Sequence, residues 1–193
     1  LLSCKEKTET VDLDSGVYSN PIVTFKNGLV EIKYNEKSDW QELNVGDELE
    51  ESSTIRTDYN SELEIIYEDR IRIYIDENTI VSFSELRLSK EKDNTAINIL
   101  QGILAVTVKL TGQDSSFNVI SGESVFGVRG TRFIVQVDPE KRVSSIVVNE
   151  GEIAVRKNIA VPADLETIMQ SSEELSGAIV QITKQEIVLT ENE

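Results

Sequence analysis

Strict alternation of apolar and polar side chains is the feature that most constrains the fold of this chain. It is clearest in Arg70-Ile71-Arg72-Ile73-Tyr74-Ile75-Asp76, where every second residue is an isoleucine. Successive side chains of an extended strand point to opposite faces, so the isoleucines share one face and the polar groups share the other. The segment is therefore predicted to be a strand with one buried face.

The same period of two recurs between residues 17 and 157, at a spacing of about ten residues. Strands are predicted for Leu29 to Tyr34, Leu63 to Tyr67, Thr79 to Phe83, Glu85 to Leu88, Ile97 to Leu100, Leu104 to Leu110, Phe117 to Ile120, Phe133 to Val137, Ser145 to Val148 and Ile153 to Val155. Valine, isoleucine and threonine are abundant here, and no amphipathic helix of useful length fits the region. These features predict an all-β domain of antiparallel-rich sheets that are stacked or rolled.

Turn-forming residues separate the predicted strands. They are Asn27-Gly28, Gly46-Asp47, Glu68-Asp69, Gly112, Gly122 and Glu150-Gly151. Glycine, asparagine and aspartate adopt the backbone conformations that tight turns require. Asn27-Gly28 is the strongest hairpin candidate, because this dipeptide favours the two-residue turn between antiparallel strands.

The pattern changes after Arg156. Pro162 leads into a segment with apolar residues near helical spacing, and Gly177 can end that short C-terminal helix. The apolar residues are Leu165, Ile168, Leu175 and Ile179. Alternation returns in Ile182 to Leu189. We therefore divide the chain into a tether (1–16), a β domain (17–157) and a helix-plus-strand extension (158–193) that begins a longer C-terminal region.

Composition narrows the possible functions. The chain has no histidine and one cysteine, which excludes Ser-His-Asp and Cys-His nucleophilic sites, most zinc sites and internal disulfides. Its formal net charge of −16 repels nucleic-acid phosphates. We expect no cofactor, no metal, no nucleic-acid partner and no enzymatic activity. A glycosidase that uses two carboxylates is the one enzyme class left open.

The first residues, Leu1-Leu2-Ser3-Cys4, are followed by a polar run that starts at Lys5. They resemble the end of the lipobox of a bacterial signal peptide, in which an apolar residue stands three places before the cysteine and a small residue directly before it. Cys4 is therefore the predicted lipidation site, and the protein is expected to be held in the bilayer through this acylated cysteine. Lys5, rather than aspartate, after the cysteine favours the outer membrane.

A second resemblance rests on an ordered series of motifs over residues 17–157. The front half contains Trp40-x-x-Leu43-x-x-Gly46-Asp47, Ile55-Arg56-Thr57 and Thr79. The back half contains Leu100-Gln101-Gly102-x-Leu104, Phe117-x-Val119, Gly127-Val128-Arg129-Gly130-Thr131-Arg132-Phe133 and Val147-x-x-Glu150-Gly151-x-Ile153-x-Val155. In order and spacing this series resembles the extracytoplasmic domain of the FecR family.

The resemblance implies a FecR-like β-sandwich or short β-solenoid. It also implies a set of family motif residues whose role is expected to be structural: Gly46, Asp47, Arg56, Thr57, Gly102, Gly127, Arg129, Gly130, Thr131, Phe133, Glu150 and Gly151. Members of the family act as periplasmic sensors that receive a signal from an outer-membrane transporter and pass it to a sigma factor. No apolar stretch here is long enough to span a membrane, so transmembrane signalling is not carried over.

The central motif also has a physical interpretation without the family. Gly127 and Gly130 flank Arg129 and permit positive φ or close backbone approach, which predicts a tight kink before the strand that contains Phe133. We expect Arg129 to satisfy nearby carbonyls with its guanidinium group. Arg56 and Thr57, after a turn, are expected to lock a corner.

The predicted function is a lipid-anchored envelope module that recognises another envelope protein through an exposed sheet edge or an added strand. Two other functions remain open. One is periplasmic signal sensing. The other is binding of peptidoglycan or another glycan, for which Trp40, Tyr59, Tyr67 and Tyr74 would supply stacking faces.

Overall fold

The computed structural model describes residues 20–88, 93–110, 115–122, 124–158 and 186–190. Within these ranges the chain forms strands and no helix. The strands are β1 (Ile22–Asn27), β2 (Val30–Lys33), β3 (Gln41–Glu42), β4 (Thr54–Thr57), β5 (Glu62–Tyr67), β6 (Ile71–Ile75), β7 (Ile80–Leu88), β8 (Asp93–Val108), β9 (Ser116–Ser121), β10 (Ser124–Val128), β11 (Arg132–Asp138), β12 (Val143–Glu150), β13 (Glu152–Lys157) and β14 (Glu186–Thr190). The predicted tether and C-terminal helix lie outside the described residues.

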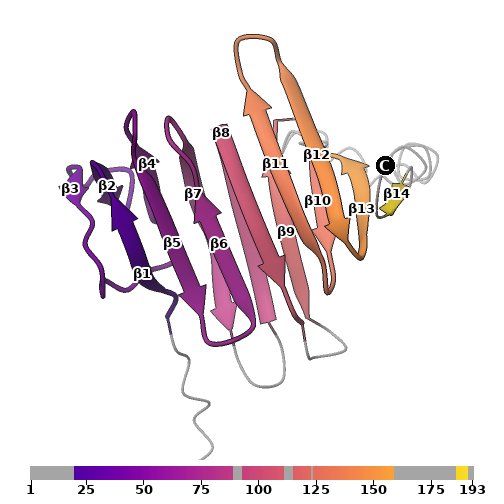
Figure 1. Ribbon diagram of the computed structural model, residues 1–193, viewed down its shortest axis with the longest axis horizontal. Coiled ribbons are helices and arrows are strands. Elements are labelled where there is room, and N and C mark those ends of the chain that lie inside the picture. Colours follow the sequence, from indigo (N-terminus) through magenta and orange to yellow (C-terminus); the bar gives the residue numbers. More distant parts are fainter. Residues whose placement is uncertain (1–19, 89–92, 111–114, 123, 159–185, 191–193) are drawn as a thin grey trace, which may run out of the picture.

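The strands form two layers that face each other (Figure 1). Layer A contains β1, β5, β6, the second part of β8, β11 and β12, in that order. Layer B contains β3, β2, β4, β7, the first part of β8, β9, β10, β13 and β14. Among the described strand pairs, β8 with β9 is parallel and the others are antiparallel. This confirms the predicted all-β fold with stacked, antiparallel-rich sheets.

The core lies between the layers and follows the alternation in the sequence. In β6, Ile71, Ile73 and Ile75 are buried while Arg72 and Tyr74 point outward. Strand β5 alternates in the same way and pairs with β6. Burying one such aliphatic side chain contributes about 1.5–3 kcal/mol. The inward faces of both layers therefore stabilise the sandwich together.

Two strands are longer than predicted because each contains an irregularity that interrupts the alternation. Strand β7 joins two predicted strands, and its register against β8 shifts between Phe83 and Glu85. Strand β8 also joins two predicted strands and bends at Gly102, which has a φ of 95°. Because of this bend, residues 93–101 pair within layer B and residues 102–108 within layer A. Both layers are thus parts of one continuous sheet.

The hairpin predicted at Asn27-Gly28 is wrong. Strand β1 pairs with β5 in layer A, whereas β2 pairs with β3 and β4 in layer B. The dipeptide therefore forms a corner at which the chain crosses between layers. Glu150-Gly151 forms a similar corner between β12 and β13. By contrast, Glu68-Asp69 lies in the β5–β6 hairpin and Gly122 in the β9–β10 hairpin, as predicted.

A glycine and a buried hydroxyl group meet at three of these crossings. A Cβ atom on Gly28 would lie 2.3 Å from Ser61 Oγ, and one on Gly102 would lie 2.1 Å from Thr79 Oγ1. A Cβ atom on Gly151 would lie 3.0 Å from Thr131 Oγ1. All three glycines have positive φ. We call Gly28–Ser61, Gly102–Thr79 and Gly151–Thr131 the corner pairs.

The hydroxyl groups at the corners satisfy backbone groups that the sheet cannot pair. Thr79 Oγ1 accepts a hydrogen bond from the Ile103 amide at 3.0 Å and donates to the Glu77 carbonyl. Thr57 Oγ1 accepts from the Thr79 amide at 3.0 Å and donates to the Asp76 carbonyl at 2.6 Å. A buried amide without a partner costs about 1–3 kcal/mol. These threonines therefore let the chain cross the sandwich without that loss.

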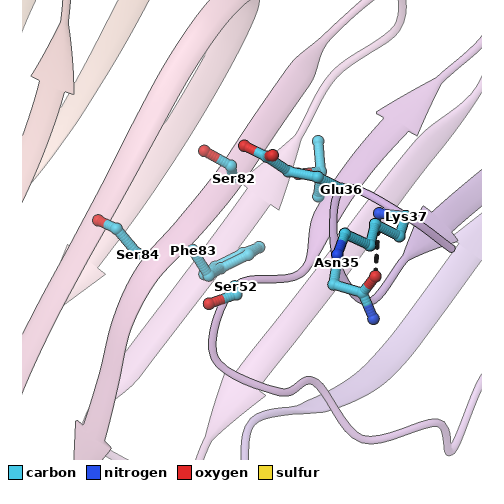
Figure 2. A pocket seen from close by; sticks show the side chains of 8 residues that line it. Asn35, Glu36, Lys37, Ser52, Ser82, Phe83 and Ser84 are labelled. Carbon is cyan, nitrogen blue, oxygen red and sulfur yellow. Dashed lines mark hydrogen bonds between the residues drawn. The ribbon is translucent and has the colours of Figure 1, made fainter.

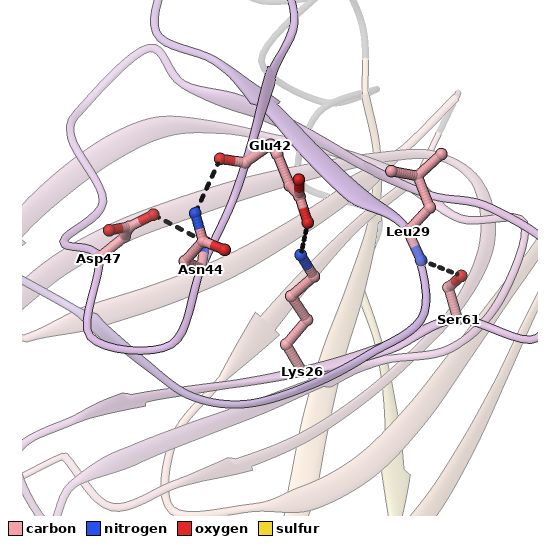
Figure 3. Close-up of polar contacts among 6 residues, drawn as sticks. All are labelled: Lys26, Leu29, Glu42, Asn44, Asp47 and Ser61. Atoms are coloured by element: carbon pink, nitrogen blue, oxygen red, sulfur yellow. Dashed lines mark hydrogen bonds and ion pairs between the residues drawn. The ribbon is translucent and has the colours of Figure 1, made fainter.

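The N-terminal end of the sandwich is closed by residues 43–49, which we call the N-terminal cap. Leu43 and Leu49 are fully buried against the core. The cap pairs with the outer edge of β1 through hydrogen bonds from the Val23 amide to the Asp47 carbonyl and from the Gly46 amide to the Val23 carbonyl. Figure 3 shows Asp47 accepting from the Asn44 amide at 2.7 Å, next to the Lys26–Glu42 ion pair. Because the cap pairs with β1, the outer edge of this strand is not free.

Gly102 and Gly46 offer a matched test of the corner pairs. Their φ angles are 95° and 93°, but nothing lies within 4 Å of a Cβ atom placed on Gly46. Gly46→Ala should therefore lower the free energy of unfolding by about 1–2 kcal/mol through backbone strain alone. Gly102→Ala should cost about 1–3 kcal/mol more, because the methyl group overlaps Thr79. Denaturant unfolding measures both, and equal losses would contradict the role of the corner pair.

Candidate interaction surface

Within the described residues, the end of the sandwich opposite the N-terminal cap finishes in two edge strands. Among the described strands, β12 pairs with β11 alone and β14 pairs with β13 alone. Figure 1 shows β12 and β14 at this end, in the two different layers. An edge strand presents a row of unpaired N–H and C=O groups. We call this region, made of β12 and β14, the open end.

Apolar side chains accompany the free backbone at the open end. Val143 and Val147 on β12 are 50% and 54% exposed, and Ile187 and Val188 on β14 are 66% and 52% exposed. Val147 lies opposite Ile134 on the outer face of layer A, and Ile134 is itself 37% exposed. Exposed apolar groups beside a free edge are typical of a surface that binds another chain.

A hollow of about 670 Å³ lies beside the β11–β12 hairpin. Its apolar lining includes Ile99, Leu100, Val137 and Val143, and Arg142 is also among the lining residues. Leu100 and Val143 are both exposed. The hollow is large enough to receive a side chain of a partner bound along β12.

The predicted motif residues of the front half lie in different parts of the fold. Gly46 and Asp47 belong to the N-terminal cap, and Thr57 is buried at a corner. Arg56 instead lies on the outer face of layer B, where its Nη2 is 2.7 Å from Glu31 Oε2. Its guanidinium carbon also lies 4.2 Å from the centroid of the Trp40 ring, a cation–π contact. Thr57 occupies a corner as expected, but Arg56 does not.

The residues of the central motif lie around the corner between β10 and β11. Thr131 is buried and donates to the Glu152 carbonyl at 2.9 Å. Phe133 is buried in the core, and Gly130 has a φ of 67°. Gly127 lies within β10 with ordinary contacts around it and no positive φ. The predicted kink is therefore at Gly130 rather than at both glycines.

Arg129 differs from its expected role. The side chain is exposed, and it makes no hydrogen bond or ion pair with any residue that the structure describes. Its carbonyl oxygen, not its guanidinium group, lies at the corner, 3.3 Å from Thr131 Oγ1. Glu150 is also exposed and lies opposite Arg132 in the register of β11 and β12. The motif residues do not meet in one pocket. Cys4 lies outside the described residues.

The four aromatic residues considered for glycan stacking do not share a surface. The Trp40 ring contacts Lys33 and Arg56 on layer B. Tyr74 faces outward from layer A, Tyr67 is buried, and Tyr59 is exposed in the turn between β4 and β5. A glycan platform needs neighbouring rings. The arrangement gives no support to this alternative.

A hollow of about 590 Å³ lies against the outer face of layer B, under the turn of residues 35–37. Figure 2 shows Ser52, Ser82 and Ser84 around Phe83, with Glu36 extending above them. Glu36 is the single carboxylate among its lining residues. Hydrolysis by a pair of carboxylates needs two acids across the bond that is cleaved, so this hollow does not supply the chemistry of a glycosidase.

The described residues contain no group of three or more His, Cys, Asp or Glu side chains arranged to hold a metal ion. The same described part of the chain contains no helix that is long and apolar enough to cross a membrane.

Comparison with known families agrees with the motif pattern. The model of the family described as FecR protein matches residues 53–154, more than half of the chain. The chain belongs to the FecR family. The match begins directly before β4 and ends in β13, so it covers the three hydroxyl residues of the corner pairs in this FecR chain.

Two crystal structures of a "putative anti-sigma factor" from Parabacteroides distasonis are similar to the FecR chain, each with 14% sequence identity and a TM-score of 0.47. Each match covers 72% of this chain and 51% of the other, so the chain spans about half the length of these solved proteins. A search of curated proteins finds no match.

Sequence reasoning missed the role of the corner hydroxyl groups, although the sequence contains a signal for them. Asp58-Tyr59-Asn60-Ser61 and Asp76-Glu77-Asn78-Thr79 are two copies of one pattern, Asp-x-Asn followed by a hydroxyl residue. In both copies the asparagine has positive φ, 53° at Asn60 and 52° at Asn78. Asparagine tolerates this conformation better than most residues. The repeat therefore marks two equivalent corners.

Tyr74 and Glu62 make a polar contact on the outer face of layer A. The Tyr74 hydroxyl group donates a hydrogen bond to Glu62 Oε2. This bond, together with burial and the negative charges of Glu62 and Asp76, raises the pKa of Tyr74 from 10.0 to about 12. On the same face, burial opposes but does not outweigh the hydrogen bonds from Thr24 and Arg72, which lower the pKa of Glu64.

The raised pKa of Tyr74 predicts a loss of stability at high pH. The unfolded chain releases the Tyr74 proton near its ordinary pKa of 10.0, whereas the folded chain holds it until about 12. The contribution is therefore fully present below pH 10 and is lost as the pH rises through this window. The ultraviolet absorbance of phenolate should show this late titration, and Tyr74→Phe should remove it. A Glu62→Gln variant that leaves it unchanged would contradict the assignment.

Proposed function

We propose that this FecR chain is a non-catalytic binding and sensing module of the bacterial cell envelope, which recognises another envelope protein by adding a strand of that partner to β12. Family membership supports the envelope setting and the regulatory, non-catalytic role. The observation that carries the proposal is the open end. There, an eight-residue edge strand with exposed apolar side chains has no pairing partner on its outer side among the described strands.

The asymmetry of the sandwich supports β12 as the binding edge. The edge of β1 is covered by the N-terminal cap, and β3 consists of two residues. Natural proteins protect edge strands against unwanted pairing by covering or shortening them. The first two edges follow this rule, whereas β12 is long and apolar. A long edge strand with exposed apolar side chains is suited to pairing with a strand of another protein.

The side chains of β12 suit recognition of an extended segment. Val147 and Ile134 form an apolar surface on layer A, while Ser145 provides a small polar group between Val143 and Val147 on the same face. The hollow next to Val143 provides a place for one partner side chain. In strand addition the backbone hydrogen bonds give affinity, and pockets for alternate side chains give specificity.

Amide hydrogen exchange tests strand addition at β12. We expect the backbone amides of residues 143–150 to become protected when the protein is incubated with solubilised envelope proteins from its native host, because an added strand pairs their outward N–H groups. Val147→Lys should abolish this protection. Its matched control is Val45→Lys, since Val45 is 60% exposed in the N-terminal cap.

Two results would contradict strand addition at β12. If Val45→Lys and Val147→Lys reduce protection to the same extent, the effect is one of general charge. If protection appears at β3 or the cap instead of β12, the binding edge lies elsewhere.

Attachment to the membrane is a separate part of the proposal. The Leu1-Leu2-Ser3-Cys4 sequence supports acylation of Cys4, with residues 1–16 as a tether, 17–157 as the FecR β domain and 158–193 as an extension. Acyl chains contribute about 0.8 kcal/mol per buried CH₂ group, so a processed cysteine with several chains would hold the domain at a bilayer, by our proposal that of the outer membrane.

Metabolic labelling tests this attachment. The full-length protein expressed in its native host should incorporate labelled palmitate and remain with the washed membrane fraction. Cys4→Ser should lose the label and appear in the soluble fraction, because Cys4 is the one cysteine of the sequence. A Ser3→Ala variant keeps a small residue before the cysteine and serves as the control. Equal labelling of the wild type and Cys4→Ser would contradict lipidation at this residue.

A further inference from the structure

A third hollow, a cleft of about 530 Å³, lies at the end of layer A where β5 turns into β6. Four cationic side chains line it: Arg70, Arg72, Lys109 and Arg132. Two carboxylates, Glu68 and Asp69, and the hydroxyl group of Thr107 also line it. A concentration of cations is unusual in a chain whose formal net charge is −16.

The register of layer A fixes the geometry of this cleft. Thr107 on β8 lies directly between Arg72 on β6 and Arg132 on β11. Because neighbouring strands are about 4.8 Å apart, the two arginine backbones are about 10 Å from each other. Both side chains are long enough to reach a group placed over Thr107. Lys109 follows on the same chain segment, and its amide donates to the Arg70 carbonyl at 2.8 Å.

The four cations differ in their partners. Arg70 is held by Glu68 at 3.0 Å and by the Tyr67 hydroxyl group at 3.2 Å. Arg72 pairs with Glu64 at 2.5 Å. Lys109 and Arg132, by contrast, form no ion pair and no side-chain hydrogen bond with any residue in the described ranges, although Glu150 lies opposite Arg132 in register. Lys109 and Arg132 are therefore available for a ligand, and together with the carboxylate of Asp69 they leave the cleft with a net positive charge.

We propose that this cleft binds a compact oxyanion with two negative charges, either a phosphate group or a small dicarboxylate. Lys109 and Arg132 supply the charges that balance it, and Arg72 and Thr107 supply further donors. Arginine and lysine donors form short, charge-assisted hydrogen bonds with such groups. The negative field of the whole chain opposes extended polyanions, such as nucleic acid or an anionic bilayer, more strongly than a single small anion.

The site is independent of strand addition at β12. The cleft residues belong to β5, β6, β8 and β11 and the segments next to them, and none of them lies on the edge strand. Loss of anion binding would leave the β12 proposal intact, and the reverse also holds.

Titration by nuclear magnetic resonance tests the site in the full chain. Inorganic phosphate and succinate are added separately at pH 8, and the ionic strength is held constant with sodium chloride. We expect the amide signals of Thr107 and Lys109 and the Nε–H signal of Arg132 to shift and saturate. Arg132→Gln and Lys109→Gln should each weaken binding by about tenfold or more, as expected when a charged hydrogen bond is lost.

The matched control is Arg156→Gln. Arg156 is also an exposed strand arginine opposite a glutamate, Glu186, but it lies in layer B away from the cleft. This variant should bind as the wild type does. Saturation with phosphate alone assigns the site to phosphate groups, with succinate alone to carboxylates, and with both to either. Shifts that rise linearly with both probes, or equal weakening by Arg156→Gln and Arg132→Gln, would overturn the proposal.

Discussion

The fold depends on the way in which the chain crosses between its two layers. At the β4–β5, β6–β7 and β10–β11 crossings a residue with positive φ is followed by a buried hydroxyl residue, as in Asn60-Ser61, Asn78-Thr79 and Gly130-Thr131. The first residue reverses the backbone direction, and the hydroxyl group pairs with backbone groups that no neighbouring strand can reach. A glycine packs against each of these hydroxyl groups because any side chain would displace it. Without this combination the sandwich would contain unpaired backbone groups at every corner.

This arrangement explains why the family motif residues are scattered over the structure. Gly102, Thr131 and Gly151 contribute to corners, and Phe133 fills the core between them. They lie where the chain changes layers and in the core. The edge of β12 and the cationic cleft of layer A, by contrast, lie on the surface of the sandwich. A scaffold built in this way agrees with the general observation that fold alone does not determine function.

Sequence patterns predicted the fold class and most strands, because alternation depends on local geometry and burial alone. They failed where the pairing or the length of a strand depends on residues that are distant in the sequence. Asn27-Gly28 has the composition of a hairpin turn, but whether β1 pairs with β2 depends on Ser61, which lies more than thirty positions further along the chain. The register shift after Phe83 and the bend at Gly102 interrupt the alternation, so β7 and β8 were each predicted as two shorter strands. The candidate surfaces could not be predicted, since a free edge is defined by the strand order of the whole sheet.

Strand β8 belongs to both layers, and this has a mechanical consequence. In a sandwich whose layers are joined only by loops and side-chain packing, no hydrogen-bonded strand runs through both layers. Here a single length of hydrogen-bonded backbone passes from β7 and β9 in layer B to β6 and β11 in layer A. A force applied to β11 and β12 is therefore transmitted along covalent bonds to the opposite layer. The two layers should therefore respond to a pull at one edge as one rigid unit, and not as two separate sheets.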